Sequence, residues 1–184
     1  MPLRIPLLLI LIAALALPAG ASAGKRTKHL WATVNVCDTQ RSPDTIGIRA
    51  RMPGNGTRQR MWMRFRTQFY STRDYAWKYV DGGSSRWLEV GSALFLYKET
   101  GYSFEIEPAP SGTQSFLLRG VVQFQWKTKG GKSKRRTRKF TASGHRTRGA
   151  DPRNFSASRC RIENPPASKE KPVFVEPKIA SPAP

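Results

Sequence analysis

The chain has 184 residues, with 32 lysines and arginines against 12 aspartates and glutamates, for a formal net charge of +20. This length suits one domain with a hydrophobic core and is too short for two comfortable ones. The positive charge favours anionic partners such as phosphate, sulfate and carboxylate polymers, but it does not indicate a fold.

Residues 1–23 have the three parts of a secretory signal peptide. Arg4 lies near the start, an apolar run of 11 residues extends from Leu7 to Leu17, and Ala21-Ser22-Ala23 is a small-residue cleavage site. The run is shorter than the roughly 20 residues that a membrane-spanning helix needs, and no later apolar stretch of that length follows. We therefore expect a secreted, extracellular protein, with association with the cell envelope as an option.

Apolar and polar residues alternate with a period of two along most of the chain, which predicts half-buried β-strands. The strands that we expect are Leu30–Cys37, Asp44–Met52, Arg60–Tyr70, Tyr75–Val80, Tyr102–Glu107, Ser115–Lys127, Lys134–Ala142 and Phe155–Ile162. Residues 81–85 are predicted to form a loop. The runs 86–90 and 93–98 fit either separate strands or one bent edge.

The same alternation predicts which side of each strand faces the core. The predicted core faces are Ile46, Ile48, Ala50 and Met52; Met61, Met63, Phe65 and Phe69; Tyr102, Phe104 and Ile106; and Phe116, Leu118, Val122, Phe124 and Trp126. The opposite side of 60–70 is aromatic and basic.

Gly130-Gly131 is a hairpin signal between 115–127 and 134–142. A two-residue turn would place Phe140 opposite Val121 on the outer face, whereas a loop with one more residue would place it opposite Val122 in the core. Because a slip of one residue turns a whole strand over, we expect the core pattern to decide the register. Arg135, Thr137 and Lys139 would then lie on the outer face. Arg136 and Arg138 would point inward and protect the edge.

The two cysteines, Cys37 and Cys160, lie in the first and last predicted strands. In an exported protein this arrangement predicts a disulfide that closes the domain. Residues 163–184 contain six prolines and little to bury, so we expect a disordered, proline-rich tail. The predicted organisation is a signal peptide at 1–23, one domain at 24–162 and the tail at 163–184.

Seven or eight strands at short spacings predict a single all-β antiparallel sandwich. Residues 108–121, PAPSGTQSFLLRGV, resemble the corner between the fifth and sixth strands of fibronectin type III and related immunoglobulin-like domains, where a turn with proline and glycine leads into a strand that begins with an aromatic. Phe116 stands where those domains usually have tyrosine. The resemblance implies a sandwich topology and adhesion or carbohydrate-associated binding. It assigns no functional residue.

The strongest candidate site is a basic and aromatic sheet face, provided that 60–70 and 115–127 are neighbours. Cations that neutralise anionic groups, together with rings that stack, are typical of polyanion or nucleic-acid binding. The candidate polyanion-binding residues are Arg64, Arg66, Arg119, Lys127, Arg135, Lys139, Trp62 and Tyr70. A solvated, charge-guarded sheet face is the alternative interpretation.

Signals for catalysis and metal binding are weak. His145 is the one plausible base and has no obvious carboxylate partner, and the pair Glu105 and Glu107 comes from a single strand. The histidines lie far apart in sequence and form no short-spaced pair with a cysteine, so we expect no metal and no cofactor. We expect a monomeric, non-catalytic module that binds an anionic polymer or cell-envelope surface, with nucleic acid bound only non-specifically. The alternatives are a structural or protein-partner module with incidental charge and, further off, a glycan-active hydrolase.

Overall fold

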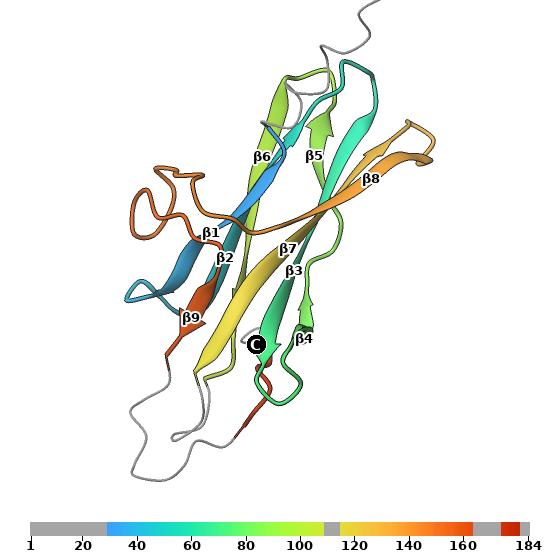
Figure 1. Cartoon of the computed structure of the whole chain (residues 1–184). Helices are drawn as coiled ribbons and strands as arrows, with labels where there is room; N and C mark the ends of the chain where they lie inside the picture. Colours follow the sequence, from blue (N-terminus) through green and yellow to red (C-terminus); the bar gives the residue numbers. More distant parts are fainter. Residues whose placement is uncertain (1–28, 109–114, 164–173, 181–184) are drawn as a thin grey trace, which may run out of the picture.

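The computed structural model describes residues 29–108, 115–163 and 174–180, and the predicted signal peptide lies outside them. These residues form an all-β domain of two antiparallel sheets (Figure 1). The strands are β1 (Trp31–Thr39), β2 (Ser42–Pro53), β3 (Arg60–Ser71), β4 (Ala76–Ser84), β5 (Leu88–Ser92), β6 (Tyr97–Glu105), β7 (Phe116–Lys127), β8 (Ser133–Phe140) and β9 (Cys160–Ile162). The predicted all-β class is confirmed.

The smaller sheet has the order β1-β2-β6, and the larger has β4-β3-β7-β8. β5 extends the larger sheet beside the start of β3, and β9 pairs with the start of β7. β3 and β7 pair along ten consecutive positions, from Arg60 opposite Lys127 to Phe69 opposite Leu118. They therefore form the centre of the larger layer, and the two sheets pack as a sandwich.

The core lies between the inner faces of the two sheets, as the alternation predicts. Ile46, Ile48, Ala50 and Met52 of β2 are fully buried, and so are Met61, Met63 and Phe65 of β3 and Leu118, Val122 and Phe124 of β7. Tyr102 is an exception to the predicted core, because its side chain is exposed and packs against the ring of Phe104. Among the described residues, no helix is long and apolar enough to cross a membrane.

The predicted disulfide is present. Cys37 and Cys160 are bonded, with their Cα atoms 5.4 Å apart across a sequence separation of 123. Cys37 belongs to β1 of the smaller sheet, while Cys160 begins β9, which pairs with β7 of the larger sheet. The bond therefore fastens the two layers to each other.

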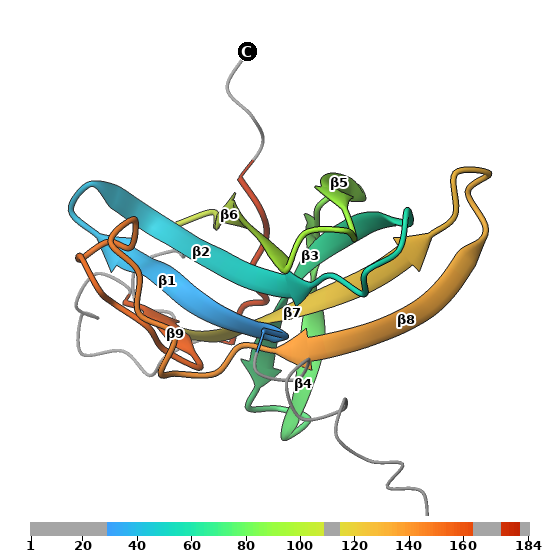
Figure 2. The same ribbon diagram turned by 90° about the horizontal axis from the view of Figure 1, so that it is seen from above.

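The register predicted for the β7–β8 hairpin is wrong. Phe140 lies opposite Val121, and Arg138 and Arg136 lie opposite Gln123 and Gln125. The hairpin extends past the ends of β1 and β2 (Figure 2), so little of the smaller sheet covers the inner side of β8. Phe140 remains 41 % exposed. Burial therefore gives β8 little preference for either register, and the assumption that the core would decide fails.

Strand boundaries between residues 81 and 105 also differ from expectation. Residues 81–84 belong to β4, which continues past a register shift opposite β3. The undecided runs separate into β5, which pairs with β3, and β6, which begins at Tyr97 and pairs with β2 in the other sheet. The chain therefore crosses from one layer to the other between Ser92 and Tyr97.

The tail prediction is corrected for residues 174–180. The Glu107 amide donates to the Lys178 carbonyl at 2.8 Å, and the Ala180 amide donates to the Glu105 carbonyl at 2.9 Å. Phe174 and Ile179 pack against the core cluster. Because Lys178 also bridges to Asp81 of β4, this segment spans the two sheets.

The sheets come close together at Gly120. A Cβ built on Gly120 would lie 2.7 Å from Ile48 Cδ1 and 2.7 Å from Thr141 Cγ2. We expect Gly120→Ala to lower the free energy of unfolding by about 1 to 3 kcal/mol, because the extra methyl overpacks the core. Urea denaturation measures this change. Gly130→Ala is the matched control, since a Cβ at Gly130 meets nothing within 4 Å; equal losses in both variants would exclude overpacking as the cause.

Candidate anion-binding face

The side of β3 and β7 that faces away from the core carries most of the predicted site. Arg64 lies opposite Gln123, Arg66 opposite Val121, and Gln68 opposite Arg119. Trp62 and Tyr70 follow on the same side of β3, and Lys127 follows on the same side of β7, because residues two apart share a sheet face. The structure therefore brings together Arg64, Arg66, Arg119, Lys127, Trp62 and Tyr70.

Arg135 and Lys139 lie on the other side of the sheet. They pair opposite Trp126 and Val122, which are core-facing residues of β7. Arg136 and Arg138 take their place on the outer side, opposite Gln125 and Gln123. The basic residues of β8 thus still contribute to the site, but through the alternate positions of the strand. We call the surface formed by Arg64, Arg66, Arg119, Lys127, Arg136 and Arg138, together with the rings beside them, the basic face.

Aromatic rings alternate with the cations of the basic face. The Arg66 guanidinium carbon lies 3.5 Å from the ring centroid of Tyr79, and that of Arg119 lies 4.2 Å from Trp77 and 4.3 Å from Phe140. Such cation–π contacts hold long side chains in place and stabilise their charge. The face is therefore an ordered array of cations.

A second pair of rings flanks Lys127. Its Nζ lies 4.6 Å from the ring centroid of Trp62 and 5.7 Å from that of Trp87. Trp77, Tyr79 and Trp87 were absent from the predicted site. Trp77 and Tyr79 belong to β4, and Trp87 directly precedes β5. Both strands pair with the edge of β3 opposite to β7. The alternation of aromatic residues at 75, 77 and 79 was the available signal.

Three arginines of the basic face have neutral hydrogen-bond partners. Arg64 Nε donates to the Ser85 carbonyl at 3.1 Å, Arg66 Nε to Ser84 Oγ at 3.0 Å, and Arg119 Nε to Gln68 Oε1 at 2.9 Å. Within the described parts of the chain, none of these three guanidinium groups forms an ion pair. Their positive charge is consequently free to act on a ligand.

Burial and a neighbouring cation both act on the pKa of Arg119. Burial lowers the pKa of Arg119 below its ordinary value, and the nearby positive charge of Arg159 lowers it further. A neighbouring cation is unfavourable to another cation and favourable to an anion. An anionic group bound beside Arg119 would relieve this repulsion.

A shallow groove of about 640 Å³ crosses this surface between β7, β8 and the segment before β5. Its lining includes Trp87, Gln123, Gln125, Lys127, Arg136 and Arg138. Three cations, two amides and an indole provide charge, hydrogen bonds and a stacking surface within one groove. These groups suit the binding of an extended anionic chain.

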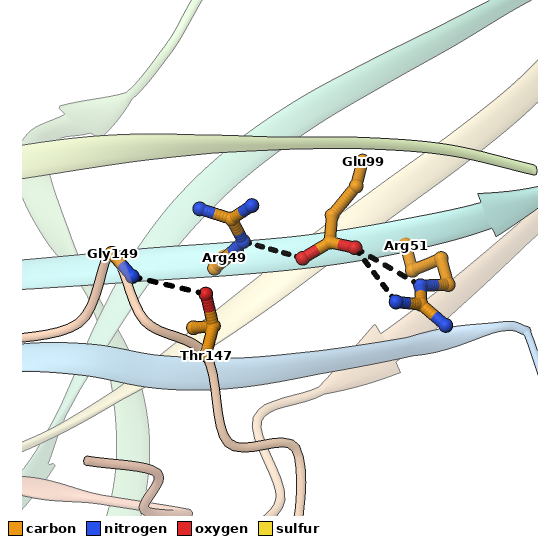
Figure 3. Close-up of polar contacts among 5 residues, drawn as sticks. All are labelled: Arg49, Arg51, Glu99, Thr147 and Gly149. Carbon is orange, nitrogen blue, oxygen red and sulfur yellow. Dashed lines mark hydrogen bonds and ion pairs between the residues drawn. The ribbon is translucent and has the colours of Figure 1, made fainter. Parts of the chain in front are cut away.

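The smaller sheet provides an internal comparison. Its outward side also carries arginines, but Glu99 lies between Arg49 and Arg51 (Figure 3). The Glu99 carboxylate accepts from Arg49 Nε at 2.5 Å and from Arg51 Nη2 at 2.9 Å. The turn at Thr147, whose Oγ1 accepts from the Gly149 amide at 3.3 Å, lies beside this cluster. Here an acidic residue offsets the cations, in contrast to the basic face.

The predicted candidates for catalysis lie away from the basic face. His145 stacks on Trp31 of the smaller sheet, with ring centroids 4.5 Å apart. Glu105 ends β6, Glu107 follows it by two residues, and both bind residues 178–180 through their backbones. In the part of the chain that the structure describes, no three metal-ligating side chains gather to hold an ion.

We expect His145 to make the free energy of unfolding depend on pH. Burial lowers its pKa below the ordinary 6.5, and Arg51 lowers it further, while Glu99 acts in the opposite direction. As the pH falls through 6.5, the unfolded chain takes up a proton before the folded protein does, so the free energy of unfolding declines. We expect His145→Gln to remove this part of the decline. Urea titrations of both proteins above and below pH 6.5 measure it, and identical pH dependence would contradict the expectation.

The fold and the basic face together define a disulfide-closed all-β sandwich whose larger sheet presents cations interleaved with aromatic rings. Comparison of the chain with protein-family models finds no match, and comparison with curated proteins finds none either. Function is therefore inferred from the chemistry of the surface.

Proposed function

We propose that the protein is an exported, monomeric and non-catalytic module that binds an anionic polymer of the cell envelope through the basic face. The signal-like residues 1–23 support export. The Cys37–Cys160 disulfide is compatible with an oxidising, extracellular compartment. Phosphate, sulfate or carboxylate groups along a polymer would each be held by one or two cations.

Among the residues that the structure describes, no carboxylate forms an ion pair with Arg64, Arg66 or Arg119, and this observation carries the proposal. Where the larger sheet does contain ion pairs, they lie toward its ends: Arg60 pairs with Glu89, and Lys78 pairs with Asp74. Between these ends, the arginines of β3 and β7 are fixed through their Nε atoms by neutral oxygens. A planar guanidinium fixed in this way can present its Nη donors to an oxyanion with little further loss of conformational freedom.

The groove suggests how an extended ligand would lie. Lys127, Arg136 and Arg138 line it together with Gln123 and Gln125. A polymer chain in this groove would place successive anionic groups against cations from β7 and β8, while the amides bind uncharged oxygens. Binding of this kind is dominated by charge and releases counterions, so it weakens steeply as salt rises.

Retention on immobilised heparin tests the proposal. We expect the protein to bind and to elute at a lower salt concentration after Arg64→Ser and Arg66→Ser are combined. For nucleic-acid polyanions each lost contact reduces the slope of log affinity against log salt by about 0.7 to 0.9, and we expect a reduction of similar size per arginine.

Arg148→Ser combined with Arg153→Ser is the matched control. It removes the same charge from exposed residues in the loop between β8 and β9 and should change retention much less. Equal losses in the two double variants would mean that net charge, and not the basic face, governs binding. A specific protein partner that stays bound at high salt would instead favour the alternative of a protein-partner module.

A further inference from the structure

The connection between β5 and β6 lies at one end of the sandwich (Figure 1). Its large apolar side chains are exposed. Leu94 is 59 % exposed, Phe95 56 % and Leu96 71 %. Single exposed apolar residues are common, but consecutive ones mark an interaction surface. We call residues 94–96 the apolar tip.

The backbone of the apolar tip is held in place by the neighbouring β2–β3 connection. The Gly54 amide donates to the Leu96 carbonyl at 2.9 Å, the amides of Asn55 and Gly56 both donate to the Ala93 carbonyl at 3.0 Å, and the Ala93 amide donates to the Gln59 carbonyl at 2.8 Å. These bonds determine how the loop presents its side chains.

Gly54 is required for this contact. A Cβ at Gly54 would lie 1.8 Å from the Phe95 carbonyl oxygen, so the two connections touch through their backbones. Ala93, at the base of the tip, is fully buried. The exposure of Leu94, Phe95 and Leu96 is therefore a feature of a packed structure, with the base of the loop anchored while the side chains project.

One cation contacts the apolar tip, and others lie near its base. The Lys98 Nζ lies 3.9 Å from the ring centroid of Phe95. A hollow of about 650 Å³ is lined by Gln59, whose carbonyl accepts from Ala93 at the base of the tip, and by Arg58, Arg60, Glu89 and Lys129. Glu89 forms an ion pair with Arg60, whereas Arg58 and Lys129 form no ion pair with any residue that the structure describes.

We propose that the apolar tip enters the interfacial region of an anionic phospholipid bilayer. Leu94, Phe95 and Leu96 would lie at the boundary between headgroups and acyl chains, where apolar side chains gain most from leaving water. Arg58, Lys98 and Lys129 would bind lipid phosphates at the headgroup level. Apolar insertion combined with attraction to anionic lipids provides the two contributions that stable peripheral binding requires.

The arrangement fits a bilayer better than a protein partner. The apolar side chains project from a loop that is flanked by cations, so they would meet a soft apolar layer covered by negative charge. The tip and the basic face belong to different surfaces, because the tip is a connection between strands whereas the basic face is the side of β3, β7 and β8. The two proposals can consequently fail separately.

Co-sedimentation with lipid vesicles tests this inference. The probes are vesicles of phosphatidylcholine with phosphatidylglycerol and vesicles of phosphatidylcholine alone. We expect the protein to bind the anionic vesicles, and the combined variant Leu94→Ser, Phe95→Ser, Leu96→Ser to bind them at least about tenfold more weakly, because three large apolar side chains no longer leave water.

Tyr75→Asn is the matched control. Tyr75 is 82 % exposed and precedes β4 at the opposite end of β3, and asparagine tolerates its positive φ of 52°. This variant should bind vesicles like the unaltered protein. The triple variant should keep its retention on heparin, since the basic face is intact. In a protein that carries Arg64→Ser and Arg66→Ser, the triple substitution at the tip should still weaken vesicle binding.

Three results would overturn the inference. The first is an unaltered protein that does not sediment with anionic vesicles. The second is a triple variant that binds them as well as the unaltered protein does, which would assign membrane binding to charge alone. The third is a dimer that becomes monomeric in the triple variant without vesicle binding, which would show that a second copy of the chain covers the tip.

Discussion

Replacing Cys37 and Cys160 together with alanine is expected to lower the free energy of unfolding by roughly 4 to 5 kcal/mol, in the chain-entropy description of a disulfide. The bond closes a loop with a sequence separation of 123, so removing the bond gives the unfolded chain many more conformations. The effect is large compared with the 5 to 15 kcal/mol by which typical domains are stable. Urea denaturation of the two proteins measures it directly.

Reduction of the unaltered protein is the internal control for this variant. A reducing agent should bring the midpoint of the unaltered protein close to that of the double variant, and it should leave the double variant unchanged. Because the bond joins β1 to β9, the packing of the two sheets near these strands should loosen first. A loss below about 1 kcal/mol would show that the sheets stay together without it.

The second large effect is expected at Trp126. Its side chain is 1 % exposed, and its Nε1 donates to the Pro53 carbonyl at 3.1 Å. We expect Trp126→Ala to lower the free energy of unfolding by about 3 to 5 kcal/mol, because it leaves a large cavity and an unpaired carbonyl. Thermal or urea unfolding measures the loss.

Trp126→Phe separates the two causes. Phenylalanine fills much of the cavity but cannot donate to Pro53, so we expect a loss of about 1 to 3 kcal/mol from the unpaired carbonyl. A phenylalanine variant as unstable as the alanine variant would mean that the hydrogen bond outweighs packing. Since Trp126 belongs to β7 and Pro53 to β2, both variants test the contact between the two sheets.

The core could be predicted from the sequence because turning a strand over would be unfavourable for both of its faces. On β2, β3 and β7, a shift of one residue would expose methionine or phenylalanine and bury arginine, so only one face can point inward. The register of β8 lacked this constraint. Its residues are charged on both sides, and Phe140 is 41 % exposed, so burial gives little preference for either pairing.

The candidate site also contains residues that the sequence pattern could place and residues that it missed. The positions of Arg64, Arg66 and Arg119 on the outer face could be predicted, because they alternate with the core residues of β3 and β7. Trp77 and Tyr79 follow β3 after a short turn, and their alternation could have placed them beside it. Trp87 lies at the end of the connection that precedes β5 and shows no such local pattern. Residues 174–180 are a similar case, since a proline-rich composition indicates little about where one short apolar segment will pack.

The register of β8 also provides the most direct test of the basic face. Arg136→Ser with Arg138→Ser and Arg135→Ser with Lys139→Ser remove the same charge from the same strand, but from opposite sides of it. If the basic face binds anionic polymers, the first pair should elute from heparin at clearly lower salt than the second pair. Equal elution of the two variants, or earlier elution of the Arg135/Lys139 variant, would contradict it.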